Sequence, residues 1–216
     1  MLTFSFPTDR PFRVLCLGAH SDDIEIGCGG TLLSLAETYP NVEITWVVFT
    51  AQGTRRQEAL DSANDFLANV SVKHIVLESF RDGFLPYMGG EVKNFFESLK
   101  KQVTPDVIFT HYRHDLHQDH RQICDLAWNT WRNHLILEYE IPKYDGDLGI
   151  PNLFFSLSAA VAQQKIDLLL KHFGTQRSKD WFTDDTFWGL MRLRGMECKA
   201  QEKYAEAFHC RKITFS

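Results

Sequence analysis

Short apolar runs alternate with helical patterns along the first two thirds of this chain, and this alternation limits the folds open to it. Strands are predicted at residues 13–18, 42–49, 74–77, 106–110 and 135–141, and helices at 31–39, 55–70, 91–102 and 122–131. Strands that alternate with helices build βαβ units, in which helices cover both faces of a parallel sheet. We therefore predict an α/β fold with a mostly parallel sheet and helices on both faces.

The last third of the sequence continues this pattern less regularly. We predict a polar turn over 144–151, a helix over 158–173, a mostly helical stretch over 183–207 and a short strand over 213–215. No repeat, low-complexity tract or linker interrupts the 216 residues. A length of this order fits one compact domain, so we expect a single domain over residues 1–216.

Charge and composition narrow the classes of function. The formal net charge is -5, which argues against nucleic-acid binding because such binding needs a basic surface. No apolar run is long enough to span a membrane, and no polybasic patch suits an anionic one. The N-terminus lacks the order of a signal peptide, and the five cysteines form no CxxC pair. We expect a cytoplasmic protein with free thiols.

Two polar segments directly follow predicted strands. The first contains His20, Asp22 and Asp23, and the second, 111–120, contains four histidines and two aspartates. Ligands of such folds bind outside the carboxyl ends of the strands, so we expect the two segments to meet. Hydrolytic zinc sites take three ligands from histidine and carboxylate side chains. His20 and Asp23 can supply two ligands, the second segment can supply the third, and Asp22 can handle a proton.

The glycine-rich run Gly27-Cys28-Gly29-Gly30 does not complete a nucleotide-binding motif. The sixth position of a GxGxxG fingerprint is occupied by Leu32, and no phosphate-binding GxxxxGK sequence is present. This disfavours a nicotinamide-dependent oxidoreductase. We expect the glycines to form a tight turn that starts the helix against the sheet.

These residues resemble the PIG-L/LmbE-like family of zinc-dependent N-acetyl-sugar deacetylases, which has a Rossmann-like sheet. The resemblance rests on Ala19-His20-Ser21-Asp22-Asp23, with serine where proline is usual, and on His117-Gln118-Asp119-His120. Glu25 lies one position later than the glutamate that often follows the first motif. Arg55 and Glu58 resemble the family's RxxE helix start, Asp82-Gly83 a DG turn near the pocket, and Tyr204–Phe208 its YAEAF segment.

The resemblance implies a role for each matching position. His20, Asp23 and His120 would bind zinc, Asp22 would be the general base, and His117 would stabilise the oxyanion. Asp119 would support a ligand imidazole, while Arg55 and Asp82 would contact substrate. The polar and aromatic segment 139–149 could shape the substrate pocket or be an ordinary surface turn.

The function predicted from these assignments is hydrolysis of the N-acetyl group of an N-acylated amino sugar or sugar conjugate by zinc-activated water. One zinc ion per chain is expected, although His and Asp sites accept several divalent metals. A metal-dependent phosphoesterase and a non-catalytic sugar- or metal-binding protein of the same fold are the alternatives. The expected partner is a small glycoconjugate, with neither nucleic acid nor membrane, and the resemblance leaves a homo-oligomer open.

Overall fold

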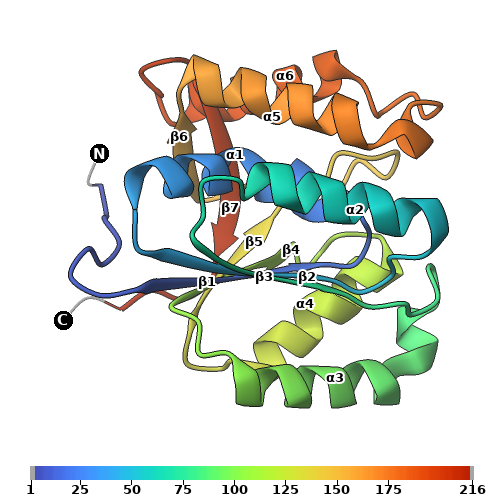
Figure 1. Ribbon diagram of the computed structural model, residues 1–216. Helices are drawn as coiled ribbons and strands as arrows, with labels where there is room; N and C mark the ends of the chain where they lie inside the picture. The colour runs from blue at the N-terminus through green and yellow to red at the C-terminus, as the bar shows by residue number, and fades with distance from the viewer. Residues whose placement is uncertain (1–2, 215–216) are drawn as a thin grey trace.

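A twisted sheet runs through the middle of the molecule (Figure 1). The computed structural model describes residues 3–214, and within them the sheet has seven strands in the order β3–β2–β1–β4–β5–β7–β6. The strands are β1 (Phe12–Gly18), β2 (Val42–Val48), β3 (Val72–Leu77), β4 (Val107–His111), β5 (Leu135–Tyr139), β6 (Leu153–Leu157) and β7 (Tyr204–Cys210). Strands β1 to β5 are parallel, and β7 lies antiparallel between β5 and β6. The predicted mostly parallel sheet is confirmed.

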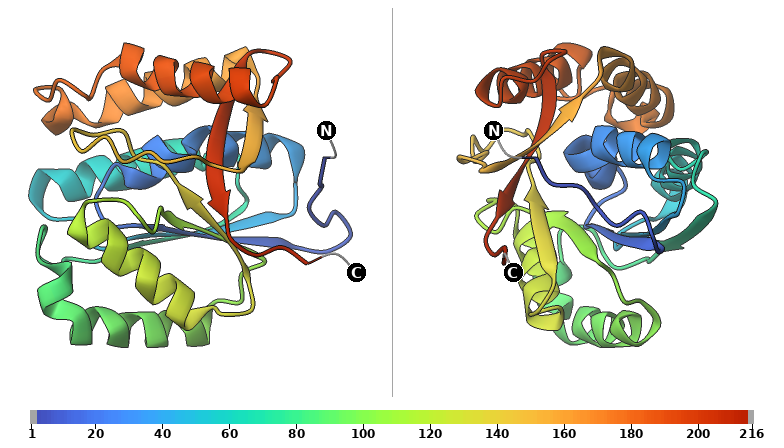
Figure 2. Two further views of the ribbon diagram at one scale, coloured as in Figure 1. Left: turned by 180° about the vertical axis from the view of Figure 1, so that it is seen from behind. Right: turned by 90° about the vertical axis from the view of Figure 1, so that its left-hand side faces the viewer.

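Helices cover both faces of this sheet, as predicted. They are α1 (Asp23–Thr38), α2 (Gly53–Phe66), α3 (Gly89–Gln102), α4 (Gln118–Thr130), α5 (Ala159–His172) and α6 (Asp184–Glu197), with 3-10 turns η1 (Leu85–Met88) and η2 (Gly174–Gln176). Helices α3 and α4 lie on one face, whereas α1 and α2 lie on the other, with α5 and α6 beyond them (Figures 1 and 2). The molecule therefore has one core on each side of the sheet.

Strand β1 contributes to both cores because its side chains alternate between the two faces. Val14 and Cys16 pack with α1, α2 and α5 residues, while Leu15 and Leu17 pack with residues of α3 and α4. All four side chains are buried. A strand covered on both faces needs a nearly continuous apolar run, which explains the Val-Leu-Cys-Leu sequence.

The strand order reverses between β1 and β4. From β1 the chain proceeds outward through β2 to β3, and it then returns to place β4 on the other side of β1. The carboxyl ends of β1 and β4 consequently lie next to each other, with the helices that follow them on opposite faces. Such a switch point is the usual ligand site of an open α/β sheet.

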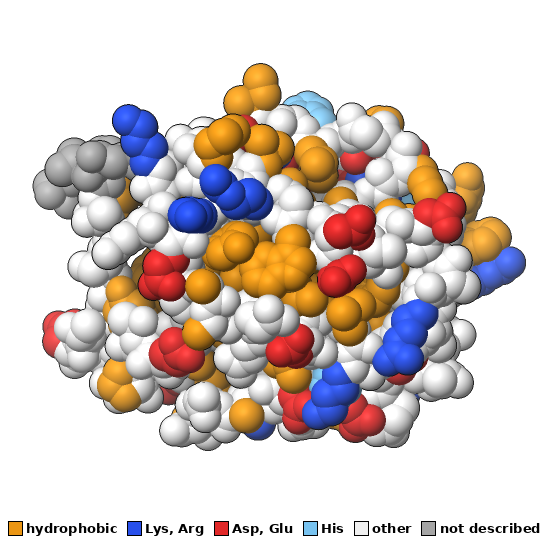
Figure 3. Space-filling model, turned by 90° about the horizontal axis from the view of Figure 1, so that it is seen from above, with side chains coloured by type: hydrophobic (Ala, Val, Ile, Leu, Met, Phe, Trp, Pro, Cys, Tyr) orange, Lys and Arg blue, Asp and Glu red, His pale blue; other side chains and the backbone are white. Residues whose placement is uncertain are grey.

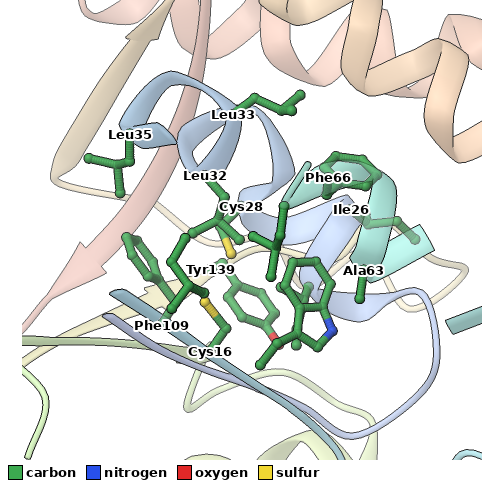
Figure 4. Packing of buried hydrophobic residues seen from close by; sticks show 14 of the residues in the cluster. Cys16, Ile26, Cys28, Leu32, Leu33, Leu35, Ala63, Phe66, Phe109 and Tyr139 are labelled. Atoms are coloured by element: carbon green, nitrogen blue, oxygen red, sulfur yellow. The ribbon is translucent and has the colours of Figure 1, made fainter. Parts of the chain in front are cut away.

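The glycine-rich run lies inside helix α1, so the expected tight turn at the start of the helix is wrong. A Cβ atom at Gly27 would lie 2.2 Å from the Tyr139 ring, and one at Gly29 would lie 2.7 Å from Phe66. Helix α1 thus packs closely over the sheet and α2 (Figure 4). The glycines provide close approach between packed elements rather than a change of chain direction.

We expect Gly27→Ala to destabilise the protein by about 1–3 kcal/mol, because overpacking displaces well-ordered neighbours. Tyr139 cannot move away easily, since it is fully buried and its hydroxyl donates to the Leu17 carbonyl at 2.7 Å. Denaturant-unfolding midpoints would measure the change. Gly189→Ala is the matched control, because Gly189 lies in α6 with nothing within 4 Å of a new Cβ, and it should be neutral or stabilising. Equal stability of Gly27→Ala and wild type would contradict the packing argument.

The C-terminal third departs from the prediction in three places. The predicted helix over 183–207 ends at Glu197, and Tyr204–Cys210 forms strand β7. Alanine and glutamate favour helices, but here β5 and β6 pair with this segment on both sides, and tertiary pairing overrides the local preference. Strand β6 was not predicted. Residues 213 and 214 form no strand, and Phe215 lies outside the described residues.

Helices α5 and α6 form an outer layer with one face toward solvent. On α6, Leu193 and Met196 are exposed, and apolar side chains gather among charged ones on this face (Figure 3). Scattered exposed apolar residues are normal in folded proteins. Across residues 3–214, the helices are too short or too polar to cross a lipid bilayer.

Candidate active site

The segment between β1 and α1 is held by backbone contacts at the carboxyl edge of the sheet. The Ala19 amide donates to His111 Nε2 at 2.9 Å, and the His20 amide donates to Asp23 Oδ2 at 2.6 Å. His20, Asp22 and Asp23 are all buried. The first polar segment is therefore a fixed structure that places one imidazole and two carboxylates directly after β1.

The second polar segment connects β4 to α4 and is organised by Asp115. One oxygen of this carboxylate accepts from the His117 amide at 2.7 Å, and the other lies 2.9 Å from His120 Nδ1. The pKa of Asp115 is lowered because interactions with His120, His111 and Lys143 outweigh the raising effect of burial. The carboxylate fixes the His120 tautomer with the proton on Nδ1, so that Nε2 is free to bind a metal.

The three predicted metal ligands come together. His20 Nδ1 lies 3.1 Å from His120 Nε2 and 3.3 Å from Asp23 Oδ2, and His120 Nε2 lies 3.5 Å from Asp23 Oδ1. A tetrahedral zinc ion with bonds of 2.0–2.2 Å separates its ligand atoms by about 3.3–3.6 Å. The two Asp23 distances involve different oxygens of its carboxylate, but the donor types and the spacings near this range suit a small divalent ion.

His111 and His117 also lie beside these ligands. The groups His20–His117–His120 and Asp23–His111–His120 each have donor atoms within 4.8 Å of one another. His111 is the weaker candidate, because its Nε2 already accepts from the Ala19 amide. A third group, His20–Asp82–Asp119, meets the same criterion, so His20, Asp23 and His120 each belong to at least one group that could hold a metal ion.

The buried imidazoles have opposite electrostatic surroundings. Burial lowers the pKa of His20, but Asp23, Asp119 and Asp82 outweigh it and raise the pKa well above its usual value. Burial and the nearby His111 instead lower the pKa of His120 to about 3. His120 is therefore neutral at physiological pH.

Asp22 is held by Arg55 from the first turn of α2. Arg55 Nη2 lies 2.6 Å from Asp22 Oδ1. Burial raises the pKa of Asp22, while the charges of Arg55, His20 and Lys179 oppose that rise and the charge of Asp23 adds to it. A buried carboxylate with a raised pKa is a stronger base than an ordinary one and is suited to accept a proton from water.

His117 is the N-cap of α4, and Asp119 lies in the first turn of that helix. His117 Nδ1 accepts from the Asp119 amide at 3.2 Å. The other ring nitrogen, Nε2, takes no part in this cap. Asp119 accepts from the amides of Gly83 at 2.8 Å and Leu85 at 3.2 Å, and its Oδ2 lies 3.4 Å from His20 Nε2. Asp119 thus supports the imidazole of His20, whereas Asp115 supports that of His120.

A cavity of about 340 Å³ opens beside these residues. Its walls include the predicted site residues His20, Asp22, Asp23, Arg55, Asp82, His117 and His120, together with Ile141, Lys143, Tyr144, Asp145, Gln176, Lys179 and Trp181. Asp82 Oδ1 lies 3.2 Å from His20 Nε2, with an exposed side chain. Asp119 is the predicted site residue that does not line the cavity.

Segment 139–149, which could have been a pocket wall or a surface turn, and Glu58 differ in their relation to the cavity. Four residues of the segment line the cavity, so the segment is part of its wall. Glu58 is not among the residues that line the cavity, and it accepts from the Thr175 amide at 2.9 Å and the Thr175 hydroxyl at 2.6 Å. Arg55 and Glu58, one helical turn apart, therefore make different contacts.

Sequence reasoning assigned no role to Asp115, Lys143 or Asp147. Lys143 Nζ lies 2.9 Å from Asp115 Oδ2 and 2.6 Å from Asp147 Oδ2, and all three side chains are nearly buried. The carboxylate that supports His120 is thereby tied to segment 139–149. Asp115 lies in the histidine-dense segment 111–120, which was predicted to contribute to the site. No pattern in the sequence indicated that Lys143 contacts Asp115.

We expect Asp115→Asn to lower metal affinity about 10- to 100-fold, the usual range for loss of a ligand's hydrogen-bonded partner. The amide cannot accept from His120, Lys143 and the His117 amide as the carboxylate does. Chelator competition on the purified protein would measure the affinity. Asp125→Asn, an exposed position on the same helix as His120, is the control. Unchanged affinity in Asp115→Asn would contradict the role assigned to this carboxylate.

The sequence of this chain matches a known protein family and a curated relative. The sequence profile of PIG-L, described as GlcNAc-PI de-N-acetylase, matches residues 15–131, which is more than half of the chain. A relative from Escherichia coli (strain K12), the uncharacterized deacetylase YaiS, is 27% identical over 168 residues, covering 74% of this chain and 89% of the relative. The range matched by the PIG-L profile, residues 15–131, includes both polar segments.

Solved structures share the fold. The N,N'-diacetylchitobiose deacetylase from Pyrococcus horikoshii, complexed with its inhibitor MPG, has a TM-score of 0.71 at 23% identity and covers 95% of this chain and 87% of its own. GalB, the 4-carboxy-2-hydroxymuconate hydratase from Pseudomonas putida KT2440, has a TM-score of 0.72 at 14% identity, covering 95% and 99%. The same fold thus carries different reactions. By the match of its sequence, this chain belongs to the PIG-L family of de-N-acetylases.

Proposed function

We propose that this protein is a zinc-dependent hydrolase that removes the N-acetyl group from an N-acylated amino sugar or sugar conjugate. The observation that carries the proposal is the 3.1–3.5 Å spacing of donor atoms from His20, Asp23 and His120, with Asp22 and His117 beside them in one cavity. Family membership supports amide hydrolysis.

His20, Asp23 and His120 would hold the ion, one per chain. When bound, zinc supplies Lewis-acid activation of water and of the amide carbonyl. The role of the surrounding protein is to orient these ligands through Asp115 and Asp119, whose contacts with His120 and His20 are direct. Another divalent metal with similar preferences would suit the same donors.

Asp22 would act as the general base. Its carboxylate is buried beside the ligands and anchored by Arg55, so it can accept the proton of the attacking water without reorienting. Arg55 also limits the rise of the Asp22 pKa that burial causes. Arg55 thereby helps to keep the carboxylate in its basic form against the effect of burial.

His117 would stabilise the oxyanion of the tetrahedral intermediate and assist departure of the amine. Its ring lies edge-on to that of His20, with centroids 4.7 Å apart, and it lines the cavity. A donor fixed before the reaction stabilises developing charge more effectively than one that must reorient. Arg55 and Asp82 would contact the substrate from the cavity walls. Acetate and a free amino sugar are the expected products.

An acetate-release screen across N-acetylated sugars, sugar phosphates and nucleotide sugars tests the proposal. Zinc-loaded protein should release acetate from at least one compound, and metal analysis should give about one ion per chain. Phosphate release from generic phosphoesters without amide cleavage would support the phosphoesterase alternative. Binding of metal and sugar without acetate release would support a non-catalytic binding protein.

A further inference from the structure

Lys179 brings a positive charge to the wall of the cavity. Its side chain lines the cavity together with Trp181, and its Nζ lies 5.3 Å from the centre of the Trp181 ring. Among residues 3–214, no carboxylate lies within 4.0 Å of this ammonium group. Lys179 and Asp22 line the same cavity, and the charge of Lys179 opposes the rise of the Asp22 pKa that burial causes.

Arg55 adds a second cation with spare hydrogen-bond donors to this side of the cavity. Its Nη2 is bonded to Asp22, but its Nε is buried and has no hydrogen-bond partner among the described residues. Guanidinium groups bind carboxylate and phosphate oxygens through several N–H groups at once. The contact with Asp22 therefore leaves donors of Arg55 available.

The turn that carries Lys179 is anchored to the same helix as Arg55. Glu58 of α2 accepts from the amide and hydroxyl of Thr175, and the Lys179 amide donates to the Gln176 carbonyl at 2.9 Å. The Phe182 amide in turn donates to the Lys179 carbonyl at 3.0 Å. The backbone of Lys179 is thus fixed relative to Arg55, although its side chain is exposed.

Among residues 3–214, the ion pair with Asp22 is the only one that Arg55 makes within 4.0 Å, and Lys179 makes none, although the charge of Arg55 also acts on Asp82. Asp82 lies against His20, and Asp145 forms no ion pair within 4.0 Å with Arg55 or Lys179 in residues 3–214. Arg55 and Lys179 both line this cavity, so an anionic group bound in it would be attracted by both cations. Charge-assisted hydrogen bonds of this kind are among the stronger polar contacts in proteins.

We propose that Lys179 and Arg55 form a subsite for an anionic substituent, phosphate or carboxylate, carried by the N-acylated amino sugar. This inference rests on the proposed function and narrows its substrate class. Lys179 would determine preference for charged over neutral substrates, and Trp181 would pack beside the sugar. Glu58 would be a positioning residue, since it acts through the turn that carries Lys179.

The test compares KM values for N-acetylglucosamine, its 1-phosphate, its 6-phosphate and the corresponding uronic acid. Wild-type protein should show a KM about tenfold lower or better for an anionic compound, the effect of one good charge-assisted contact. A preference confined to the phosphates or to the uronic acid identifies the source of the charge. Lys179→Met should raise the KM for the preferred anionic compound about tenfold more than for the neutral sugar, and Lys179→Arg should restore the preference. Lys171→Met, whose lysine pairs with Asp65 outside the cavity, is the control and should keep wild-type values.

Equal KM values for neutral and anionic sugars, or an equal rise for both in Lys179→Met, would overturn the subsite while leaving the proposed function intact. If no compound releases acetate, calorimetric binding of glucosamine 6-phosphate and of the amino uronic acid distinguishes the two ideas. Binding of either that weakens about tenfold in Lys179→Met supports the subsite while the proposed function fails. Binding of both that is unchanged in Lys179→Met overturns the subsite as well.

Discussion

Replacing Asp22 by asparagine should lower turnover about 10²–10⁴-fold, the usual contribution of a positioned general base. The amide has nearly the shape of the carboxylate and can still contact Arg55 through its oxygen, so the fold should be kept. Asparagine cannot take a proton from water at neutral pH. Because Asp22 is not among the three donors spaced at 3.1–3.5 Å, the metal content should stay at about one ion per chain.

Acetate release and metal analysis of the same preparation would check this prediction. Asp61→Asn is a matched control, because Asp61 lies on α2 away from the cavity, where it pairs with the Gln57 amide. The control should behave as wild type in both measurements. Near-wild-type turnover in Asp22→Asn would show that another group is the base. Loss of the metal would show instead that Asp22 is a ligand.

The fold class and the meeting of the two polar segments could be predicted because both depend on local patterns. Apolar runs bounded by turns mark the strands, and the strand order of open α/β sheets places the ends of β1 and β4 together. The segments 19–23 and 111–120 each follow one of these strands directly. Their proximity is therefore a consequence of topology rather than of any long-range signal in the sequence.

Features set by long-range contacts could not be predicted. Glu206 was placed in a helix, but it lies in β7 and accepts from the amides of Gly30 and Thr31 in α1 at 2.9 and 2.6 Å. Lys165 Nζ lies 2.6 Å from Glu206, and this buried pair clamps α1 one to two turns after the first polar segment. The local sequences around Lys165 and Glu206 contain no pattern that indicates a partner more than 40 positions away.

The same limit applies to the support of the site. Asp115 is close to His120 in sequence, yet its second partner, Lys143, comes from beyond β5. The glycines of α1 were expected to form a turn, but they lie inside a helix where Tyr139 and Phe66, from distant elements, leave no room for a side chain. Sequence patterns therefore located the polar segments that meet at the cavity, and tertiary packing determined how each side chain is oriented.

Replacing His120 by alanine should abolish metal binding, reduce the metal content from about one ion per chain to near zero, and remove activity with it. His120 is buried, contacts both other proposed ligands and is held by Asp115, so its loss leaves only two donors where a hydrolytic zinc site needs three. Metal analysis after dialysis would measure this, with circular dichroism to show that the fold is kept. His172→Ala is the control, because His172 pairs with Asp65 outside the cavity and should keep its metal. Full metal content in His120→Ala would mean that His117 or His111, whose donor atoms lie in overlapping groups, supplies the third ligand instead.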